Sequence, residues 1–216
     1  MQNSAHIPST SDPVAARKAF SERARQIRLD RGLTIQDVSD RSGLAVSTIS
    51  KIERNLMAPT YDRFSQLAHG LGVDLAQLFA VAGTAFAPGT FQISRPGDEG
   101  YLETENYTYE MLFPDLNGRT MTPILGTLKP REEMRFDRMV SHSGEEFLFI
   151  IEGEVVVKSE GQDDVVLRAG ESLYFDSGRG HLYASATKGP ARILSVCTGQ
   201  GTVIPEATSR SEDTEG

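Results

Sequence analysis

Apolar residues in the first third of the chain recur with the spacing of α-helices. From Pro13 onward they return every three or four positions, and Asp12 followed by Pro13 has the form of a helix start. Thr34 and Asp37 have the spacing of a capping box, with Asp in place of Glu. Further helical segments, punctuated by Gly and Pro, are expected at residues 34–42, 45–55, 61–71 and 75–80. Five short helices predict a small all-α domain.

After about Gly83 the pattern changes to short runs in which apolar and polar residues alternate, separated by turn residues. These runs, each a predicted strand, are residues 106–112, 122–128, 132–140, 146–151, 153–159, 164–169, 172–176, 181–185 and 191–197. Many short strands at this spacing predict an all-β antiparallel sandwich or barrel.

The two patterns predict a multidomain chain. The expected division is a flexible arm (1–12), a helical domain (13–80), a Gly-, Ala- and Pro-rich linker (81–91), a strand domain (92–205) and a disordered acidic tail (206–216).

Charge divides the chain in the same way. The net charge of −8 argues against a general nucleic-acid binder, but residues 14–80 carry 10 Lys and Arg against 7 Asp and Glu, a balance of +3. Residues 81–216 carry 12 against 22, a balance of −10. One cysteine allows no disulfide framework, and no signal peptide or long apolar run is evident, so we expect a cytoplasmic protein without a membrane partner.

The segment QDVSDRSGLAVSTISKIERN joins two short helices through a turn that contains Gly43. In the second helix, Ile49 and Ile52 are three residues apart and are expected to face inward. This leaves five short polar or basic side chains facing outward: Ser47, Thr48, Ser50, Lys51 and Arg54. A helix that enters the major groove of DNA needs this division into a docking face and a reading face.

Residues 27–79 resemble the lambda-repressor-like (Xre-type) helix-turn-helix family, most specifically in VSTISKIERN, the following PT and LAHGLGV. The resemblance implies that the helix near Val46 is the recognition helix and that Ser47, Thr48, Ser50, Lys51 and Arg54 contact DNA. We expect Arg28 to contact the DNA backbone. Because the local charge is modest, we expect a homodimer on a two-fold operator. A helix bundle that no longer binds DNA is the alternative.

The segment SHSGEEFLFIIEG places His142 and Glu146 on either side of a Ser-Gly turn, and His181 follows a second Gly-rich turn. Two histidines and one carboxylate are sufficient for a metal site with open positions. If His142 points inward, strand alternation brings Arg138 to the same face, where it could bind a carboxylate. Weaker ligand-binding candidates, each more readily explained by packing, are Tyr107, Tyr109 and Tyr183.

These segments resemble the two motifs of the cupin family, a double-stranded β-helix or jelly-roll barrel. The second motif aligns at Gly170, Asp176, Gly178, His181 and Ser185, and the first at Val140, His142, Glu146 and Gly153. Val140 replaces the first histidine of the family pattern. The resemblance implies a divalent metal (Zn, Fe, Mn or Ni) on His142, Glu146 and His181. Alternatively, His142 and Glu146 hydrogen-bond a ligand or one another.

The order of the two domains resembles a group of transcriptional regulators, not enzymes, in which the cupin domain binds a small-molecule effector and the helical domain binds an operator. It also resembles mononuclear non-heme iron oxygenases of the epoxidase type, which use the same His-x3-Glu…His triad and have tyrosines at positions matching Tyr107 and Tyr109. This chain departs from those enzymes at Arg28, Met139 and Cys197. We therefore favour the regulator.

Overall fold

The computed structural model describes residues 13–73, 75–79, 84–135 and 139–198. Asp12, the expected arm and the expected acidic tail lie outside these residues. Among the described helices, none combines the length and apolar character that crossing a membrane requires.

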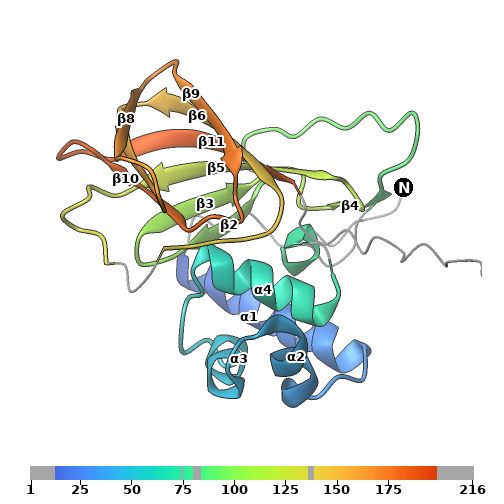
Figure 1. Cartoon of the computed structure of the whole chain (residues 1–216). Coiled ribbons are helices and arrows are strands. Elements are labelled where there is room, and N and C mark those ends of the chain that lie inside the picture. Colours follow the sequence, from blue (N-terminus) through green and yellow to red (C-terminus); the bar gives the residue numbers. More distant parts are fainter. Residues whose placement is uncertain (1–12, 74, 80–83, 136–138, 199–216) are drawn as a thin grey trace, which may run out of the picture.

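The predicted helical domain is confirmed. Its helices in the described residues are α1 (Pro13–Asp30), α2 (Ile35–Ser42), α3 (Val46–Glu53), α4 (Tyr61–Leu71) and the 3-10 helix η1 (Leu75–Leu78). Figure 1 shows α2 and α3 at the end of this domain that lies away from the strands. The two helices are therefore placed where a large partner can reach them.

Local chemistry explains where α2 begins and how α3 docks. The Thr34 hydroxyl accepts from the Asp37 N–H at 3.0 Å, and the Asp37 carboxylate accepts from the Thr34 N–H at 2.7 Å, which confirms the capping box. Gly43 ends α2 in the left-handed conformation, with φ of 72°. In α3, Ile49 and Ile52 are fully buried, as their spacing predicted.

The strand domain is also confirmed as a mainly antiparallel barrel built from two sheets. A six-stranded sheet has the order β2-β3-β5-β11-β6-β9, and a three-stranded sheet has the order β10-β7-β8. The larger sheet contains β2 (Gly100–Glu103), β3 (Tyr107–Met111), β5 (Met121–Leu128), β6 (Glu145–Glu152), β9 (Ser172–Asp176) and β11 (Ala191–Thr198). The smaller one contains β7 (Glu154–Ser159), β8 (Val165–Arg168) and β10 (His181–Ser185). A separate parallel pair joins β1 (Thr84–Ala85) to β4 (Leu116–Asn117). Buried and half-buried residues alternate along β11, so one face of this strand lines the barrel interior.

One predicted strand is wrong. Within residues 132–140, the described positions form a turn at 131–133, irregular backbone and a single bridge at Val140. The Asn106 side chain takes the place of a neighbouring strand: its amide donates to the Arg135 carbonyl at 2.6 Å and its oxygen accepts from the Arg135 N–H at 2.9 Å. The sequence pattern also missed β1, β2 and β4, and β1 lies within the expected linker.

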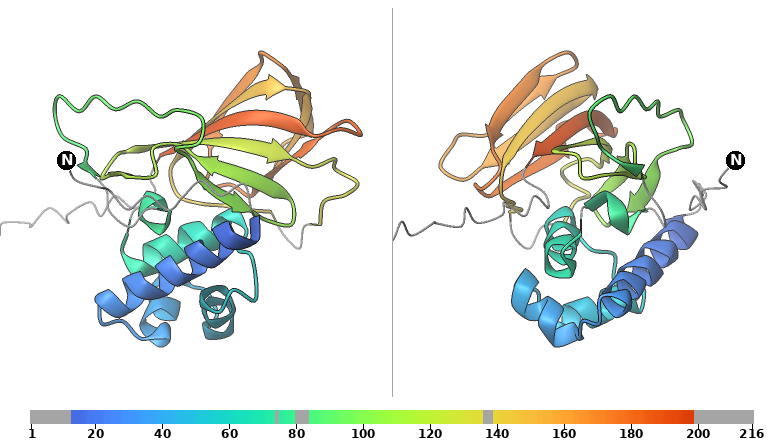
Figure 2. Two further views of the ribbon diagram at one scale, coloured as in Figure 1. Left: turned by 180° about the vertical axis from the view of Figure 1, so that it is seen from behind. Right: turned by 90° about the vertical axis from the view of Figure 1, so that its right-hand side faces the viewer.

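Aromatic side chains form the junction between the two domains. Phe64 of α4 packs edge-on against Tyr109 of β3, with ring centroids 5.6 Å apart, and against Phe79 at 6.2 Å. Gly100 lies so close to Phe79 that an added Cβ would be 2.7 Å from the Phe79 Cβ. Figure 2 shows from two further sides that α1 and α4 are the helices next to the sheets. The two domains therefore share one continuous core.

Candidate metal and DNA-binding sites

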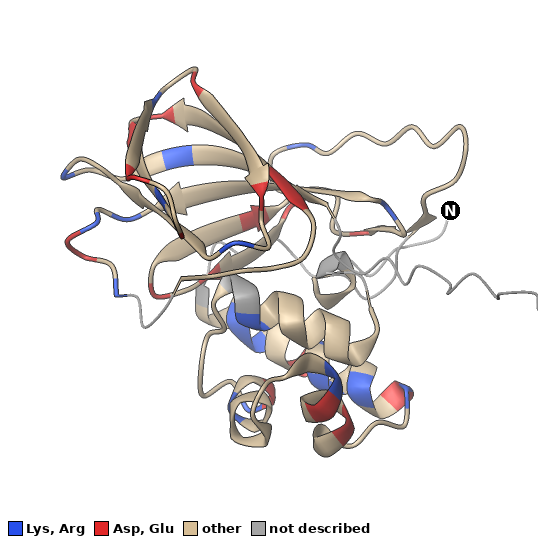
Figure 3. Cartoon of the chain, in the orientation of Figure 1, with Lys and Arg blue, Asp and Glu red and all other residues tan. Residues whose placement is uncertain are grey.

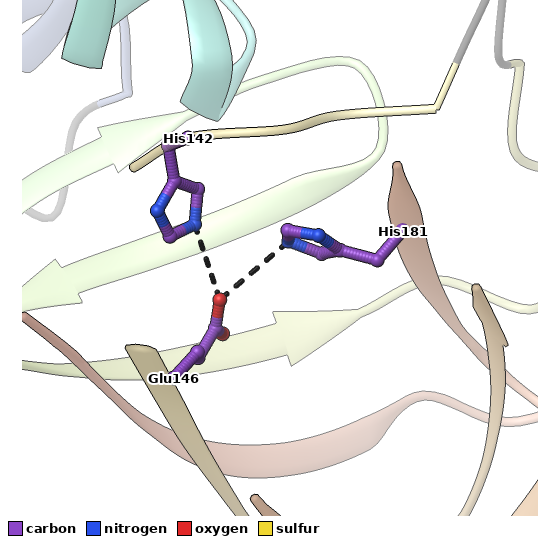
Figure 4. Close-up of side chains that lie close together, drawn as sticks. All are labelled: His142, Glu146 and His181. Atoms are coloured by element: carbon purple, nitrogen blue, oxygen red, sulfur yellow. Dashed lines mark hydrogen bonds and ion pairs between the residues drawn. The ribbon is translucent and has the colours of Figure 1, made fainter. Parts of the chain in front are cut away.

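Three separate segments bring His142, Glu146 and His181 together in the barrel. Glu146 is on the inner face of β6, and His181 is the first residue of β10. The loop before β6 carries His142, whose N–H donates to the Ser177 carbonyl at 2.9 Å. Figure 4 shows both imidazoles pointing at the carboxylate.

One carboxylate oxygen is the focus of this cluster. Oε2 of Glu146 lies 3.2 Å from Nε2 of His142 and 3.5 Å from Nε2 of His181. The side chains of these residues are only 3–4% exposed. The ligand atoms of all three lie within 4.8 Å of one another, which is the spacing that three ligands of one ion require.

Protonation in this cluster also suits a metal. Burial alone would raise the pKa of the Glu146 carboxyl, but the His142 hydrogen bond, the charges of both imidazoles and the Ser195 hydroxyl hold that pKa below its ordinary value. Burial lowers the pKa of His181, against the opposing charge of Glu146. An ionised carboxylate beside a neutral imidazole is the state that metal binding needs.

Hydrogen bonds behind the cluster orient its ligand atoms. The Nδ1 atom of His181 lies 2.8 Å from the Arg179 carbonyl, so Nδ1–H donates there and Nε2 presents its lone pair to the site. The Ser195 hydroxyl donates to Oε1 of Glu146 at 2.5 Å, which leaves Oε2 facing the histidines. The donor set and its orientation thus fit a divalent metal.

The cluster opens onto a narrow cavity inside the barrel. Its volume is about 40 Å³, and because one water needs at least ~10–15 Å³ it has room for about three waters. Side chains of β3, β5, β10 and β11 make its walls mainly apolar, and Glu146, His181 and Ser195 are among its polar groups. Val140, which replaces the first cupin histidine, lines the cavity and pairs with His181 through two backbone hydrogen bonds of 2.8 and 2.9 Å.

The three tyrosines proposed as ligand contacts line this cavity. The Tyr107 hydroxyl donates to the Tyr183 carbonyl at 2.8 Å, so it holds β3 against β10. Burial, and then the charge of Glu146, raise the pKa of the Tyr183 hydroxyl well above its ordinary value. Arg138 lies outside the described residues.

The predicted DNA-reading face of α3 is turned away from the helical core. Ser47, Lys51 and Arg54 are exposed, whereas Thr48 and Ser50 are half-buried. The Arg54 Nε atom donates to the Ser50 carbonyl at 3.1 Å, which draws this side chain back along the helix. Figure 3 shows both basic residues (blue) and acidic residues (red) on the helices.

Arg28 is the exception among the proposed DNA contacts. It is 9% exposed, and its guanidinium forms a two-point ion pair with Glu53 of α3 at 2.6 and 2.9 Å. Another nitrogen of the group donates to the Leu33 carbonyl at 2.9 Å. The expectation that Arg28 contacts the DNA backbone is therefore corrected, because its donors hold α1, α3 and the following turn together.

The sequence pattern did not identify two residues of these sites, Ser195 and Glu53. Ser195 occupies a buried position in the alternation of β11, between the apolar residues Ile193 and Cys197. The sequence did contain a sign of this role, because Ser195 is a polar residue at a position where the alternation predicts a buried one, and buried polar groups need a hydrogen-bond partner. Glu53 gave a weaker signal, as a carboxylate next to the inward Ile52.

Comparison with known proteins agrees with this architecture. A helix-turn-helix family model matches residues 25–78, and a cupin domain model matches residues 125–197. The HTH-type transcriptional regulator PuuR of Escherichia coli (strain K12) is 27% identical over 180 residues, which cover 83% of this chain and 95% of PuuR.

A further relative by sequence is an enzyme, and a solved structure with a similar fold is a regulator. The (S)-2-hydroxypropylphosphonic acid epoxidase of Streptomyces wedmorensis is 26% identical over 149 residues, covering 63% of this chain and 73% of that protein. The crystal structure of an HTH_3 family transcriptional regulator from Vibrio cholerae covers 87% of this chain and 98% of its own, with 20% identity and a TM-score of 0.61. The chain therefore contains a helix-turn-helix domain and a cupin domain, and it is homologous to the HTH-type transcriptional regulator PuuR.

Proposed function

We propose that the protein is a sequence-specific DNA-binding transcriptional regulator whose cupin domain binds a small-molecule effector and thereby changes operator affinity. The observation that carries this proposal is the division of α3, in which Ile49 and Ile52 are fully buried while Ser47, Lys51 and Arg54 are exposed. Its relationship to PuuR supports the same function.

The proposed operator contacts are Ser47, Thr48, Ser50, Lys51 and Arg54. Ser47 and Thr48 lie in the first turn of α3, so their hydroxyls suit base edges. Lys51 lies in the last turn and Arg54 directly after the helix, so these basic groups suit phosphates. One such helix gives little affinity by itself. A homodimer that presents two copies of α3 to a two-fold operator supplies the rest of the DNA-binding affinity.

For the cupin domain, we propose that His142, Glu146 and His181 hold a divalent metal, Zn, Fe, Mn or Ni, next to the cavity. When bound, the metal would supply a Lewis-acidic centre with open positions for an effector. Tyr107, Tyr109 and Tyr183 form walls of the same cavity. In this proposal they shape the space available to the effector.

The junction between the domains offers a physical route for coupling. Tyr109 lines the cavity, and its ring also packs on Phe64 of α4. A ligand that moves Tyr109 would thus disturb the helical core directly. Allosteric coupling of this kind is typically about 1–3 kcal/mol, or about 5–150-fold in affinity.

Operator binding can be tested by fluorescence anisotropy with DNA from upstream of the protein's own gene, at ~150 mM salt with competitor DNA. We expect nanomolar binding, weakened about tenfold or more by Lys51→Ala or Arg54→Ala. Arg168→Ala, on the exposed strand β8, is the matched control and should bind as the wild type does. Binding no tighter than to random DNA would overturn the regulator proposal.

Metal content can be measured by elemental analysis of protein purified without chelators. We expect about one divalent metal per chain, lost in His142→Ala but retained in Glu145→Gln, which removes a neighbouring exposed carboxylate. Absence of metal in the wild type, even after incubation with each candidate ion, would contradict the metal site. The cavity would then bind its effector through hydrogen bonds alone.

A mononuclear iron oxygenase is the second candidate function. The triad and the relationship to the Streptomyces epoxidase favour it. The two functions predict different results for the same preparation, because an oxygenase would consume oxygen with iron and a substrate but would not need a specific operator. Specific DNA binding together with no iron-dependent oxygen consumption would decide for the regulator.

A further inference from the structure

Residues 86–95, called the strap here, connect β1 to the region before β2. Figure 1 shows this segment in green as an extended connection that stands off the body of the molecule, and both views of Figure 2 show the same. Its path contains a turn between Ala87 and Thr90, but none of it belongs to a helix or strand.

Along residues 91–94, the strap exposes its apolar side chains and turns its polar ones toward the protein. Phe91 is 90% exposed and Ile93 is 60% exposed, whereas Gln92 between them is half-buried. The Gln92 amide donates to the Asp115 carboxylate at 2.9 Å, which fixes this orientation. Phe86, at the start of the strap, is 56% exposed. A segment in which apolar and polar residues alternate normally buries its apolar side. The strap therefore has the pattern of a strand, but no described residue of this chain covers its apolar side.

The middle of the strap, residues 91–94, also has unpaired backbone groups. Within the part of the chain that the structure describes, residues 91–94 make no backbone-to-backbone hydrogen bond. Extended backbone with free N–H and C=O groups and an apolar row readily pairs with another strand, and proteins normally protect such segments. Among the described residues, no helix or strand covers the exposed side of Phe91 and Ile93.

We propose that a second copy of this chain covers the apolar row of the strap, and that Phe86, Phe91 and Ile93 anchor the homodimer. This inference rests on the proposed function, which requires two copies of α3 on one operator. An extended segment is self-complementary about a two-fold axis, because two copies meet antiparallel with equivalent contacts on both sides.

The area of the strap is sufficient for a major part of such an interface. At roughly 200 Å² for a large apolar side chain, exposures of 56%, 90% and 60% leave on the order of 400 Å² per copy, about half of the ~800 Å² per partner typical of a stable interface. An area of this size matches the largest apolar patch of a typical monomer, roughly 300–600 Å², and such a patch is often functional.

Light scattering coupled to size-exclusion chromatography tests the proposal without DNA. One chain is 23.6 kDa, and we expect twice that mass for the wild type at ~10 µM. The variant Phe91→Ser/Ile93→Ser should be monomeric at this concentration, with its dissociation constant raised at least about 100-fold. Val165→Ser/Val166→Ser, on the exposed edge strand β8, should remain dimeric. Circular dichroism verifies that each variant is folded.

Two outcomes would overturn the strap interface. A monomeric wild type would mean that a segment of the same chain, or another protein, covers the strap. A variant that stays dimeric would place the interface elsewhere. A dimer that binds no specific DNA would leave the strap interface intact and defeat the proposed function instead.

Hydrogen exchange of the wild type provides a second measurement that needs no variant. The amides of residues 91–94 should exchange at least about tenfold more slowly at a concentration where the protein is dimeric than after dilution to monomer. Equally fast exchange in both states would contradict the interface even if the chain dimerises.

Discussion

At the scale of single residues, the two buried carboxylates Glu53 and Glu146 have different partners and different consequences. The Glu53 side chain is 5% exposed and pairs with a permanent cation, Arg28, across two helices. Glu146 is 3% exposed and faces two imidazoles that can be neutral. The first arrangement stabilises a fold, whereas the second gathers three potential metal-ligand atoms within 4.8 Å of one another.

Replacing Glu53 with Gln should destabilise the protein by about 2–4 kcal/mol, because it leaves the Arg28 guanidinium buried without its counter-ion. Urea unfolding measures this free energy. The control is Glu22→Gln, which breaks an exposed pair with Lys18 at 3.8 Å and should cost less than about 0.5 kcal/mol. Equal losses in the two variants would show that the buried pair contributes no more than an exposed one.

Ser195→Ala should weaken metal binding by about 10–100-fold while leaving the three ligands in place. The reason is that the Ser195 hydroxyl orients Glu146 through its other oxygen, and partners of this kind tune metal affinity by that amount. Competition with a chelating dye measures the dissociation constant, with the exposed Ser172→Ala as control. An unchanged constant would assign Ser195 to packing only.

At the scale of elements, helix ends and helix contacts are determined by different forces. The start of α2 depends on a local capping box, whereas α3 is held by Ile49, Ile52 and the distant Arg28. The Thr34 hydroxyl and then the Thr34 N–H lower the pKa of the Asp37 carboxyl, because both donate to its ionised form.

The contribution of Asp37 to stability should therefore depend on pH. A carboxyl whose pKa is lowered in the folded state stabilises the protein above its unfolded pKa, about 3.9, and this contribution is lost as the pH falls through the folded value. Urea midpoints of the wild type and Asp37→Asn should differ at pH 7 and converge as the pH approaches 3. A constant difference across this range would exclude the ionised cap.

At the scale of the whole molecule, the aromatic junction joins two domains that have separate sequence patterns. Phe20, Phe64 and Phe79 contact one another in the helical domain, and Phe64 extends the cluster to Tyr109 in the barrel. Because Tyr109 also lines the cavity, this junction ties the state of the cavity to the position of the helices.

Tyr109→Ala should remove this tie. We expect the wild type to unfold in one cooperative thermal transition and the variant to unfold in two, with a loss of about 3–5 kcal/mol in the barrel from the deleted ring. Differential scanning calorimetry detects the difference. Phe175→Ala, which deletes a half-buried ring in the barrel away from the junction, should leave a single transition.

The sequence by itself determined the elements and much of the triad. Apolar residues recur about every 3.6 positions in a helix and every 2 positions in a strand, and both spacings are local properties of the sequence. Five helices and most strands could therefore be predicted, as could the Thr34 cap. His142, Glu146 and His181 were identifiable because their spacing around Gly-rich turns matches a known motif. Only the tertiary structure decided that Arg28 is buried, that Asn106 replaces a strand partner for residues near Arg135, and that Ser195 reaches Glu146. These features depend on pairs 25, 29 and 49 residues apart, and no local pattern specifies which distant group will occupy the space beside a side chain.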